Sequence, residues 1–157
     1  MRAKTYIMIK PGFADSGEML DALREKLLEY NFAVEVEGFV KYTVADARRH
    51  YAEHVGKNFY PNLEQYITSD RAYGVVVYKN VNAREFFSGK VITDGREVVK
   101  SLRAYAEALM PNFYNQTRNA VHGSDGPSSA EKEISLFKDM LKREAGANAS
   151  PKIILDV

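Results

Sequence analysis

Residues 72–78, Ala-Tyr-Gly-Val-Val-Val-Tyr, decide the fold class, because three consecutive valines strongly favour the pleated backbone of a β-strand. Residues 5–10 form a second short apolar run, closed by Pro11-Gly12, which is typical of a central strand covered on both faces. Residues 32–42 alternate loosely between apolar and polar and predict a third, half-exposed strand. Helical patterns separate these strands, so we expect an α+β sandwich.

The helices are predicted from capping residues and from apolar residues spaced by three or four. We expect them from Asp15 to Tyr30, from Thr43 to about Val55, from Pro61 to Ile67, from Asn82 to Phe87, from Glu97 to Leu109, and from a cap at Ser128 to Leu141. The Gly-containing residues 92–95 predict a turn between the fourth and fifth helices.

A single domain is predicted over residues 1–142, followed by a tail over residues 143–157. Residues 143–150 are rich in Ala, Gly and Asn, which predicts an extended segment ending in the strand-like residues 153–155. No internal repeat or linker divides the chain.

Composition excludes several classes of protein. The 157 residues include 22 Lys and Arg against 21 Asp and Glu, so the net charge of +1 does not indicate a nucleic-acid partner. The absence of cysteine excludes disulfides and Cys-ligated metals. No apolar run is long enough for a signal peptide or a membrane span, so we expect a soluble, cytoplasmic protein without a membrane partner.

Two of the three histidines lie in His50-Tyr-Ala-Glu53-His54, which matches the H-x-x-E-H pattern of some zinc peptidases. The pattern is short, and Arg48-Arg49 adds positive charge that would oppose a divalent cation. We therefore favour a solvated helix face for His50 and His54, and expect no metal site in the protein. A zinc peptidase that uses these two histidines stays as a minor alternative.

The third histidine, His122, lies among small residues in Asn119-Ala-Val-His-Gly-Ser-Asp125-Gly. Gly123 and Gly126 would let a bulky ligand approach, and the helix that follows would favour a negative charge. An imidazole in this setting can meet a phosphate, although a buried structural histidine in a tight turn fits the residues equally well.

From Tyr6 to Phe137 the sequence resembles nucleoside diphosphate kinases. Residues 119–125 are similar to the active-site signature of that family, and residues 129–137, Ser-Ala-Glu-Lys-Glu-Ile-Ser-Leu-Phe, to its following helix. Residues 7–11, Ile-Met-Ile-Lys-Pro, resemble its first strand with a phosphate-contacting lysine. The resemblance implies a ferredoxin-like antiparallel sheet covered by helices.

The resemblance also implies a ping-pong transfer of the γ-phosphate from a nucleoside triphosphate to a nucleoside diphosphate through phosphohistidine at His122. Glu133 would orient the ring of His122, with Ser124 between them. Lys10 would act with these three residues as part of the catalytic group. A neutral imidazole is a good nucleophile at pH 7, which fits this chemistry.

By the same resemblance, the nucleotide is expected to contact the residues that match the family's binding segments. These are Lys10 and Asn119 for the sugar and phosphate, Tyr51 for the phosphate, Phe59 for stacking on the base with Leu63 beside it, and Thr93 and Arg103. Mg²⁺ would bridge the phosphate oxygens, with Asp125 as an outer contact. A homo-oligomer, commonly a hexamer in the family, is implied.

The sequence departs from the family between Val81 and Gln116. The family has a helix arginine, a threonine and a loop ending in Pro-Gly-Thr-Ile-Arg-Gly. One register aligns Thr93 and Arg103 with the threonine and the loop arginine and leaves Lys90 near the helix arginine. A second register places Arg103 at the helix arginine and deletes most of the loop. We prefer the first, because it needs fewer gaps. A module that binds nucleotide without turnover is the main alternative function.

Overall fold

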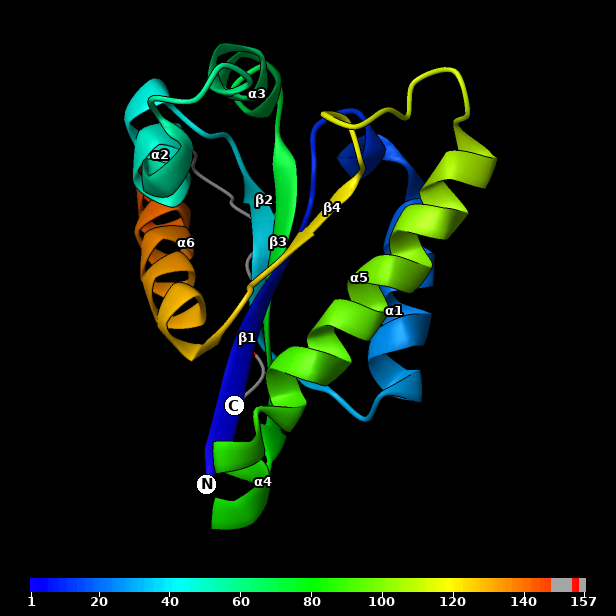
Figure 1. Cartoon of the computed structure of the whole chain (residues 1–157), viewed down its shortest axis with the longest axis vertical. Coiled ribbons are helices and arrows are strands. Elements are labelled where there is room, and N and C mark those ends of the chain that lie inside the picture. The colour runs from blue at the N-terminus through cyan, green and yellow to red at the C-terminus, as the bar shows by residue number, and fades with distance from the viewer. Residues whose placement is uncertain (148–153, 156–157) are drawn as a thin grey trace.

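The computed structural model describes residues 1–147 and 154–155, whose strands form one sheet in the order β4-β1-β3-β2-β5 (Figure 1). The strands are β1 (Arg2–Ile9), β2 (Ala33–Val40), β3 (Ala72–Asn80), β4 (Val121–Gly123) and β5 (Ile154–Leu155). Each neighbouring pair is antiparallel. The three strands predicted from the sequence are therefore confirmed, and β5 confirms the strand at the C-terminal end, where residue 153 lies outside the described part.

The first four strands follow the ferredoxin-like topology, as expected. Helix α1 (Gly17–Glu29) connects β1 to β2, and α4 (Ala83–Ser88) with α5 (Lys90–Leu109) connects β3 to β4. Helices α1 and α5 lie together over one face of the sheet (Figure 1). Alternate residues of the central strands, such as Ile7, Ile9, Val75 and Val77, form the core beneath them.

The opposite face of the sheet is covered by α2 (Val44–His50), α3 (Tyr60–Ile67) and α6 (Pro127–Ala147). Two short 3-10 segments, η1 (Phe13–Asp15) and η2 (Ala52–His54), complete the described elements. The core on this side contains Tyr6, Met8 and Val76 from the strands and Phe137 from α6. The apolar residues of α6 at spacings of three or four face this core, because Ala130, Phe137 and Leu141 are buried and Ile134 is partly buried.

The predicted turn at residues 92–95 is wrong, because α5 runs without a break from Lys90 to Leu109. Tertiary contacts explain the turn-forming residues. Gly95 provides space for Thr5, whose Cγ2 would lie 3.2 Å from a Cβ at this position. The carboxylate of Asp94 pairs with Lys79 at 2.7 Å and with Lys90 at 3.2 Å.

Some helix ends also differ from the prediction. Ser16 caps α1 by accepting a hydrogen bond from the Met19 amide at 3.2 Å, and α6 begins at Pro127, so Ser128 lies inside the helix. Helix α6 continues to Ala147, so the expectation of an extended chain is wrong for residues 143–147, and residues 148–150 lie outside the described part. The division into a domain and a tail at residue 142 stays a prediction.

Among the described residues, no helix is long and apolar enough to cross a bilayer.

The helix start predicted at Thr43 is confirmed, and the capping box found there gives a first test of the fold. The Thr43 hydroxyl accepts from the Asp46 amide at 3.1 Å, and the Asp46 carboxylate accepts from the Thr43 amide at 2.9 Å. We expect Thr43→Ala to lower the free energy of unfolding by about 1 kcal/mol in urea titrations. Thr93→Ala is the matched control, because Thr93 is exposed in the first turn of α5, where it caps no amide, and its loss should change stability by less than about 0.5 kcal/mol. Equal losses in the two variants would contradict the role of the cap.

Candidate active site

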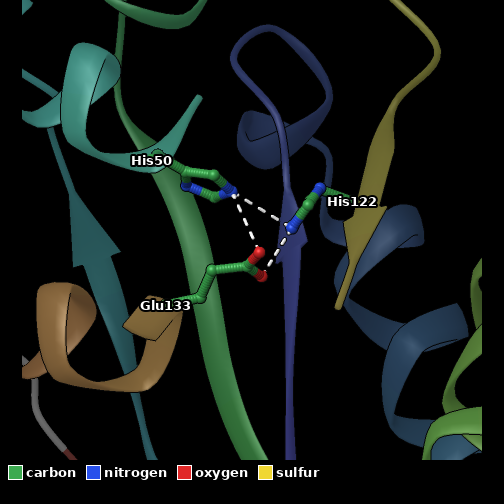
Figure 2. Close-up of side chains that lie close together, drawn as sticks. All are labelled: His50, His122 and Glu133. Carbon is green, nitrogen blue, oxygen red and sulfur yellow. Dashed lines mark hydrogen bonds and ion pairs between the residues drawn. The ribbon is translucent and has the colours of Figure 1, made fainter. Parts of the chain in front are cut away.

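Three polar side chains from three different elements meet on the α2 and α6 side of the sheet (Figure 2). Nε2 of His122 lies 2.7 Å from Oε1 of Glu133 and 3.1 Å from Nε2 of His50. Nε2 of His50 lies 3.8 Å from Oε2 of Glu133. The side chains are 16, 1 and 10% exposed for His122, His50 and Glu133 respectively, so the cluster is largely shielded from water.

The register of the sheet determines where His122 points. His122 is the central residue of β4 and lies opposite Met8 on β1. Residues paired across two strands point to the same face, and Met8 belongs to the core beneath α2, α3 and α6. The ring of His122 therefore faces His50, the last residue of α2, and Glu133 in the second turn of α6.

Two side chains of the cluster, Glu133 and His50, each have a further hydroxyl partner. Oγ of Ser124 donates to Oε1 of Glu133 at 2.9 Å, and Tyr42 Oη lies 2.8 Å from Nδ1 of His50. The expectation that Ser124 lies between the carboxylate and His122 is wrong, because Glu133 contacts the ring directly and Ser124 supports the carboxylate from the side.

Burial keeps both imidazoles neutral. Burial, aided by neighbouring positive charge, lowers the pKa of His50 and of His122 to about 3. Burial also raises the pKa of the Glu133 carboxyl. A neutral ring carries one proton, and in His122 the contact with the Glu133 carboxylate places it on Nε2. Nδ1 of His122 then has a free lone pair.

Lys10 and Asn119 lie together next to this cluster. Lys10 follows β1 and is 5% exposed, and its Nζ donates to Oδ1 of Asn119 at 2.6 Å. Burial and the nearby Arg103 guanidinium lower the pKa of Lys10 to about 7. Ala120 has a φ of 75° in the left-handed region, and its carbonyl accepts from the Lys10 amide at 2.8 Å. This uncommon backbone conformation places Asn119 beside Lys10 immediately before the strand of His122.

Tyr51, Phe59 and Leu63, which lie between the end of α2 and the middle of α3, differ in how far they are exposed. Tyr51 stacks on His50 with ring centroids 4.4 Å apart, and its buried hydroxyl has no hydrogen-bond partner among the described residues. Phe59 is half exposed at the start of α3, and its ring lies 5.4 Å from that of His54. Leu63 is 9% exposed and packs mainly in the core.

A model of the family described as nucleoside diphosphate kinase matches residues 3–141. The chain belongs to the nucleoside diphosphate kinase family. It is therefore an enzyme of a family of nucleotide-binding transferases with kinase activity, and nucleotide phosphotransfer is the reaction that this membership implies.

Curated relatives and solved structures agree with this assignment. The nucleoside diphosphate kinase of Mycobacterium sp. strain MCS is 34% identical, with 87% of this chain and 97% of that protein covered. That of Heliobacterium modesticaldum is 31% identical, with 85 and 86% covered. The crystal structure of the Aquifex aeolicus nucleoside diphosphate kinase has a TM-score of 0.68 at 22% identity, covering 87% of this chain and 95% of that one, and it confirms the fold.

Residues 93–103, which the preferred register aligns with the threonine and the loop of the family, lie in helix α5, and the irregular connection to β4 begins only after Leu109. Arg103 lies partly buried in the helix, and its Nε donates to the Val121 carbonyl at 3.0 Å. Thr93 is exposed ten residues earlier, about 15 Å along the helix axis. Lys90 pairs with Asp94 at 3.2 Å. The structure therefore brings Arg103 to β4 but neither Thr93 nor Lys90, and it supports the register that deletes the loop.

The interpretation of His50 as part of a solvated face is wrong. His50 joins His122 and Glu133, whereas His54 lies on η2, where its Nδ1 is 3.1 Å from Nζ of Lys57. Among the described residues, the side chains close enough together to hold a metal ion are those of His50, His122 and Glu133. His54 is not one of them, so the H-x-x-E-H pattern does not form a peptidase site.

Packing, rather than access for a ligand, explains why residue 123 is a glycine. A Cβ at this position would lie 2.6 Å from Cγ2 of Val99, so the glycine allows α5 to pack against β4. A Cβ at Gly126 would meet nothing within 4 Å.

Proposed function

We propose that this enzyme transfers the γ-phosphate of a nucleoside triphosphate to a nucleoside diphosphate through phosphohistidine at Nδ1 of His122. The observation that carries the proposal is the contact of 2.7 Å between Nε2 of the neutral His122 and the Glu133 carboxylate. It fixes the tautomer that leaves the Nδ1 lone pair free, and a carboxylate behind an imidazole also stabilises the charge that the ring gains on attack.

In the first half-reaction, the Nδ1 lone pair of His122 forms a bond to the γ-phosphorus. The bond from that phosphorus to the β,γ-bridging oxygen breaks, and the nucleoside diphosphate leaves with the electron pair. The ring becomes a phosphoimidazole whose Nε2 proton is held by Glu133. In the second half-reaction, a terminal oxygen of an acceptor diphosphate attacks the same phosphorus and releases His122 in its original state.

Three cationic or polar side chains, of which Lys10 and Arg103 are close enough to lower the pKa of His122, are assigned to the phosphates. Lys10 and Asn119 form one hydrogen-bonded pair, and Arg103 lines a cavity of about 440 Å³ together with Asn119. The proximity of Arg103 contributes to the lowered pKa of Lys10, and an anionic phosphate between these two cations would relieve their repulsion. Cations in this arrangement stabilise the charge on the equatorial oxygens during phosphoryl transfer.

Tyr51 is assigned to the phosphate because its buried hydroxyl has no hydrogen-bond partner in the part of the chain that the structure describes, and such a group in a folded protein calls for an explanation. We expect Tyr51→Phe to change the free energy of unfolding by less than about 0.5 kcal/mol, but to lower kcat/KM about tenfold. Tyr66→Phe is the matched control, because Tyr66 donates to the Pro11 carbonyl at 2.6 Å. That variant should lose about 1 kcal/mol of stability. A Tyr51→Phe enzyme with unchanged kcat/KM would refute the assignment.

The base is assigned to Phe59, whose half-exposed ring offers a face on which purines and pyrimidines can stack. Leu63 can add only a small contact, because most of its side chain is in the core. Thr93 was also expected to contact the nucleotide, but its position on α5 gives no support to that role. A solved nucleoside diphosphate kinase from Halobacterium salinarum, 24% identical to this chain, is in complex with CDP, so binding of a diphosphate is part of the proposal.

Mg²⁺ is expected to arrive with the nucleotide and to neutralise phosphate charge. It needs few protein ligands and prefers oxygen. The exposed Asp125 carboxylate, which pairs with Arg96 at 3.2 Å, fits an outer contact to such an ion. A homo-oligomer and a cytoplasmic location stay expectations from the family. Since β5 pairs with Val36 and Glu37 of β2, a second copy would have to use a surface other than that segment of the edge.

The proposal is tested by incubating the protein with Mg²⁺ and ATP labelled at the γ-phosphate. We expect an acid-labile, base-stable phosphoprotein, which loses its label when GDP is added and yields labelled GTP. A protein that binds ATP but takes up no label would be a nucleotide-binding module without turnover.

A further inference from the structure

Outside their assigned role in phosphotransfer, His50, His122 and Glu133 have the donor set of a metal centre. One ligand atom from each residue, a ring nitrogen or a carboxylate oxygen, lies within 4.8 Å of those of the other two, and the three side chains point toward one another (Figure 2). We propose that these three residues bind a transition-metal dication of the zinc class, and that the bound ion switches off the nucleophile.

The separations suit a small tetrahedral ion. Zinc binds nitrogen and oxygen ligands at about 2.0–2.2 Å, which places two ligand atoms of a tetrahedron about 3.3 Å apart. The corresponding separations are 3.1 Å between the two Nε2 atoms, 2.7 Å from Nε2 of His122 to Oε1 of Glu133, and 3.8 Å from Nε2 of His50 to Oε2 of Glu133. A rotation of the Glu133 carboxylate that brings one oxygen toward both Nε2 atoms would complete three corners of the site.

The groups behind the ligands also match those of a metal centre. A metal-bound histidine usually donates its second ring N–H to an oxygen, which fixes its orientation. Nδ1 of His50 lies 2.8 Å from the Tyr42 hydroxyl, and when Nδ1–H donates to this oxygen, the Nε2 lone pair is free to bind a metal. The Glu133 carboxylate is held by Ser124 at 2.9 Å. The site is thus supported before any ion binds.

The type of ligand selects the kind of ion. Two imidazoles and one carboxylate suit Zn²⁺, Co²⁺, Ni²⁺ or Cu²⁺, whereas Mg²⁺ prefers oxygen ligands only. With three protein ligands, a fourth position stays available for water or a phosphate oxygen. His122 is the most exposed of the three side chains, which gives an ion a route into the site.

Metal binding and phosphotransfer exclude one another, because each requires the single ring proton of His122 to be on a different nitrogen. This consequence rests on the proposed function. A metal on Nε2 of His122 occupies the lone pair at that nitrogen. The single proton of the neutral ring must then be on Nδ1, which no longer has a free lone pair to attack phosphorus. Conversely, phosphorylation of Nδ1 keeps the proton on Nε2 and prevents the metal from binding there.

The binding itself is tested by equilibrium dialysis of metal-free protein against Zn²⁺ with elemental analysis, and by titration with Co²⁺. We expect one equivalent of Zn²⁺, and visible Co²⁺ absorption typical of a tetrahedral site. His50→Gln and Glu133→Gln should each weaken binding more than tenfold, since even the loss of a supporting group costs about ten- to hundredfold.

His54→Gln is the matched control and should bind as the parent does. Tyr42→Phe keeps all three ligands and should still weaken binding about tenfold, which provides a test if a ligand variant fails to fold. The proposal is overturned if no saturable binding occurs, or if the well-folded His50→Gln variant binds as tightly as the parent.

Inhibition of phosphotransfer by the bound metal is tested separately, by labelling of the protein with ATP. Zn²⁺ added at constant Mg²⁺ should slow labelling of the protein by ATP, a chelator should restore it, and the isolated phosphoprotein should not bind Co²⁺. A phosphoprotein that binds Co²⁺ as well as the free protein would overturn the exclusion. If the metal-free protein takes up no label at all, the proposed function fails while the dialysis still decides whether the metal site exists.

Discussion

His122→Ala should abolish the phosphoprotein and lower the rate of transfer between nucleotides by at least about 10⁴-fold, or about 5.4 kcal/mol. The loss is large because the variant has no second nucleophile in the same place. His50 is the nearest imidazole, but its side chain is 1% exposed and its Nε2 faces His122 and Glu133 rather than the solvent. Retention of label after electrophoresis measures the phosphoprotein, and a coupled assay measures the transfer.

The control for this prediction is His54→Ala, which removes an imidazole from η2 without touching the cluster. It should keep its phosphoprotein and lose at most a few-fold in rate. Circular dichroism should show that His122→Ala is folded, because the change leaves Glu133 with its hydrogen bond from Ser124. Stoichiometric labelling of folded His122→Ala would contradict the assignment of His122 as the nucleophile.

Most of the sheet could be predicted because its strands are determined by local sequence. Residues 75–77 are valines, and residues 7–9 are Ile-Met-Ile, so the pleated backbone is favoured whatever surrounds it. The order of the strands came from the resemblance to a family, since local patterns do not contain the pairing of β1 with both β3 and β4.

The break predicted in α5 failed because the residues involved serve contacts between elements. Asp94 and Gly95 are turn-forming residues in isolation. In the protein, Asp94 pairs with Lys79 of β3 and Gly95 makes room for Thr5 of β1. Neither partner is near in the sequence, so the pattern favoured a turn where packing stabilises a helix.

His50 was missed for a related reason, although the sequence contains a signal for it. Ala47 and Tyr51 are both buried, and His50 lies at the intermediate helical spacing that shares their face. An inward-facing stripe at residues 47, 50 and 51 would have placed His50 toward the sheet. The arginines at residues 48 and 49 lie on the opposite, solvent-facing side of the helix, and their charge favoured the prediction of a solvated position for His50.

Arg103→Ala should lower kcat about a hundredfold, or about 2.7 kcal/mol, with a smaller effect on binding of the nucleoside diphosphate. The side chain is held in position because its Nε donates to the Val121 carbonyl, one residue before His122. Its remaining N–H groups can then meet a phosphate in the cavity that it shares with Asn119. Single-turnover labelling by ATP isolates this step from product release.

Two further variants separate the geometry of Arg103 from its charge. Arg103→Lys keeps the charge but loses the planar fork and the hydrogen bond to β4, so it should recover only part of the rate. Arg96→Ala removes an exposed cation from the same helix, where it pairs with Asp125, and should cost a few-fold at most. The loss of the hydrogen bond to Val121 should lower the stability of Arg103→Ala by about 1 kcal/mol. If Arg103→Ala labels as fast as the parent while Arg96→Ala does not, the phosphate lies about two helical turns nearer the start of α5, and the cation that stabilises transfer is Arg96.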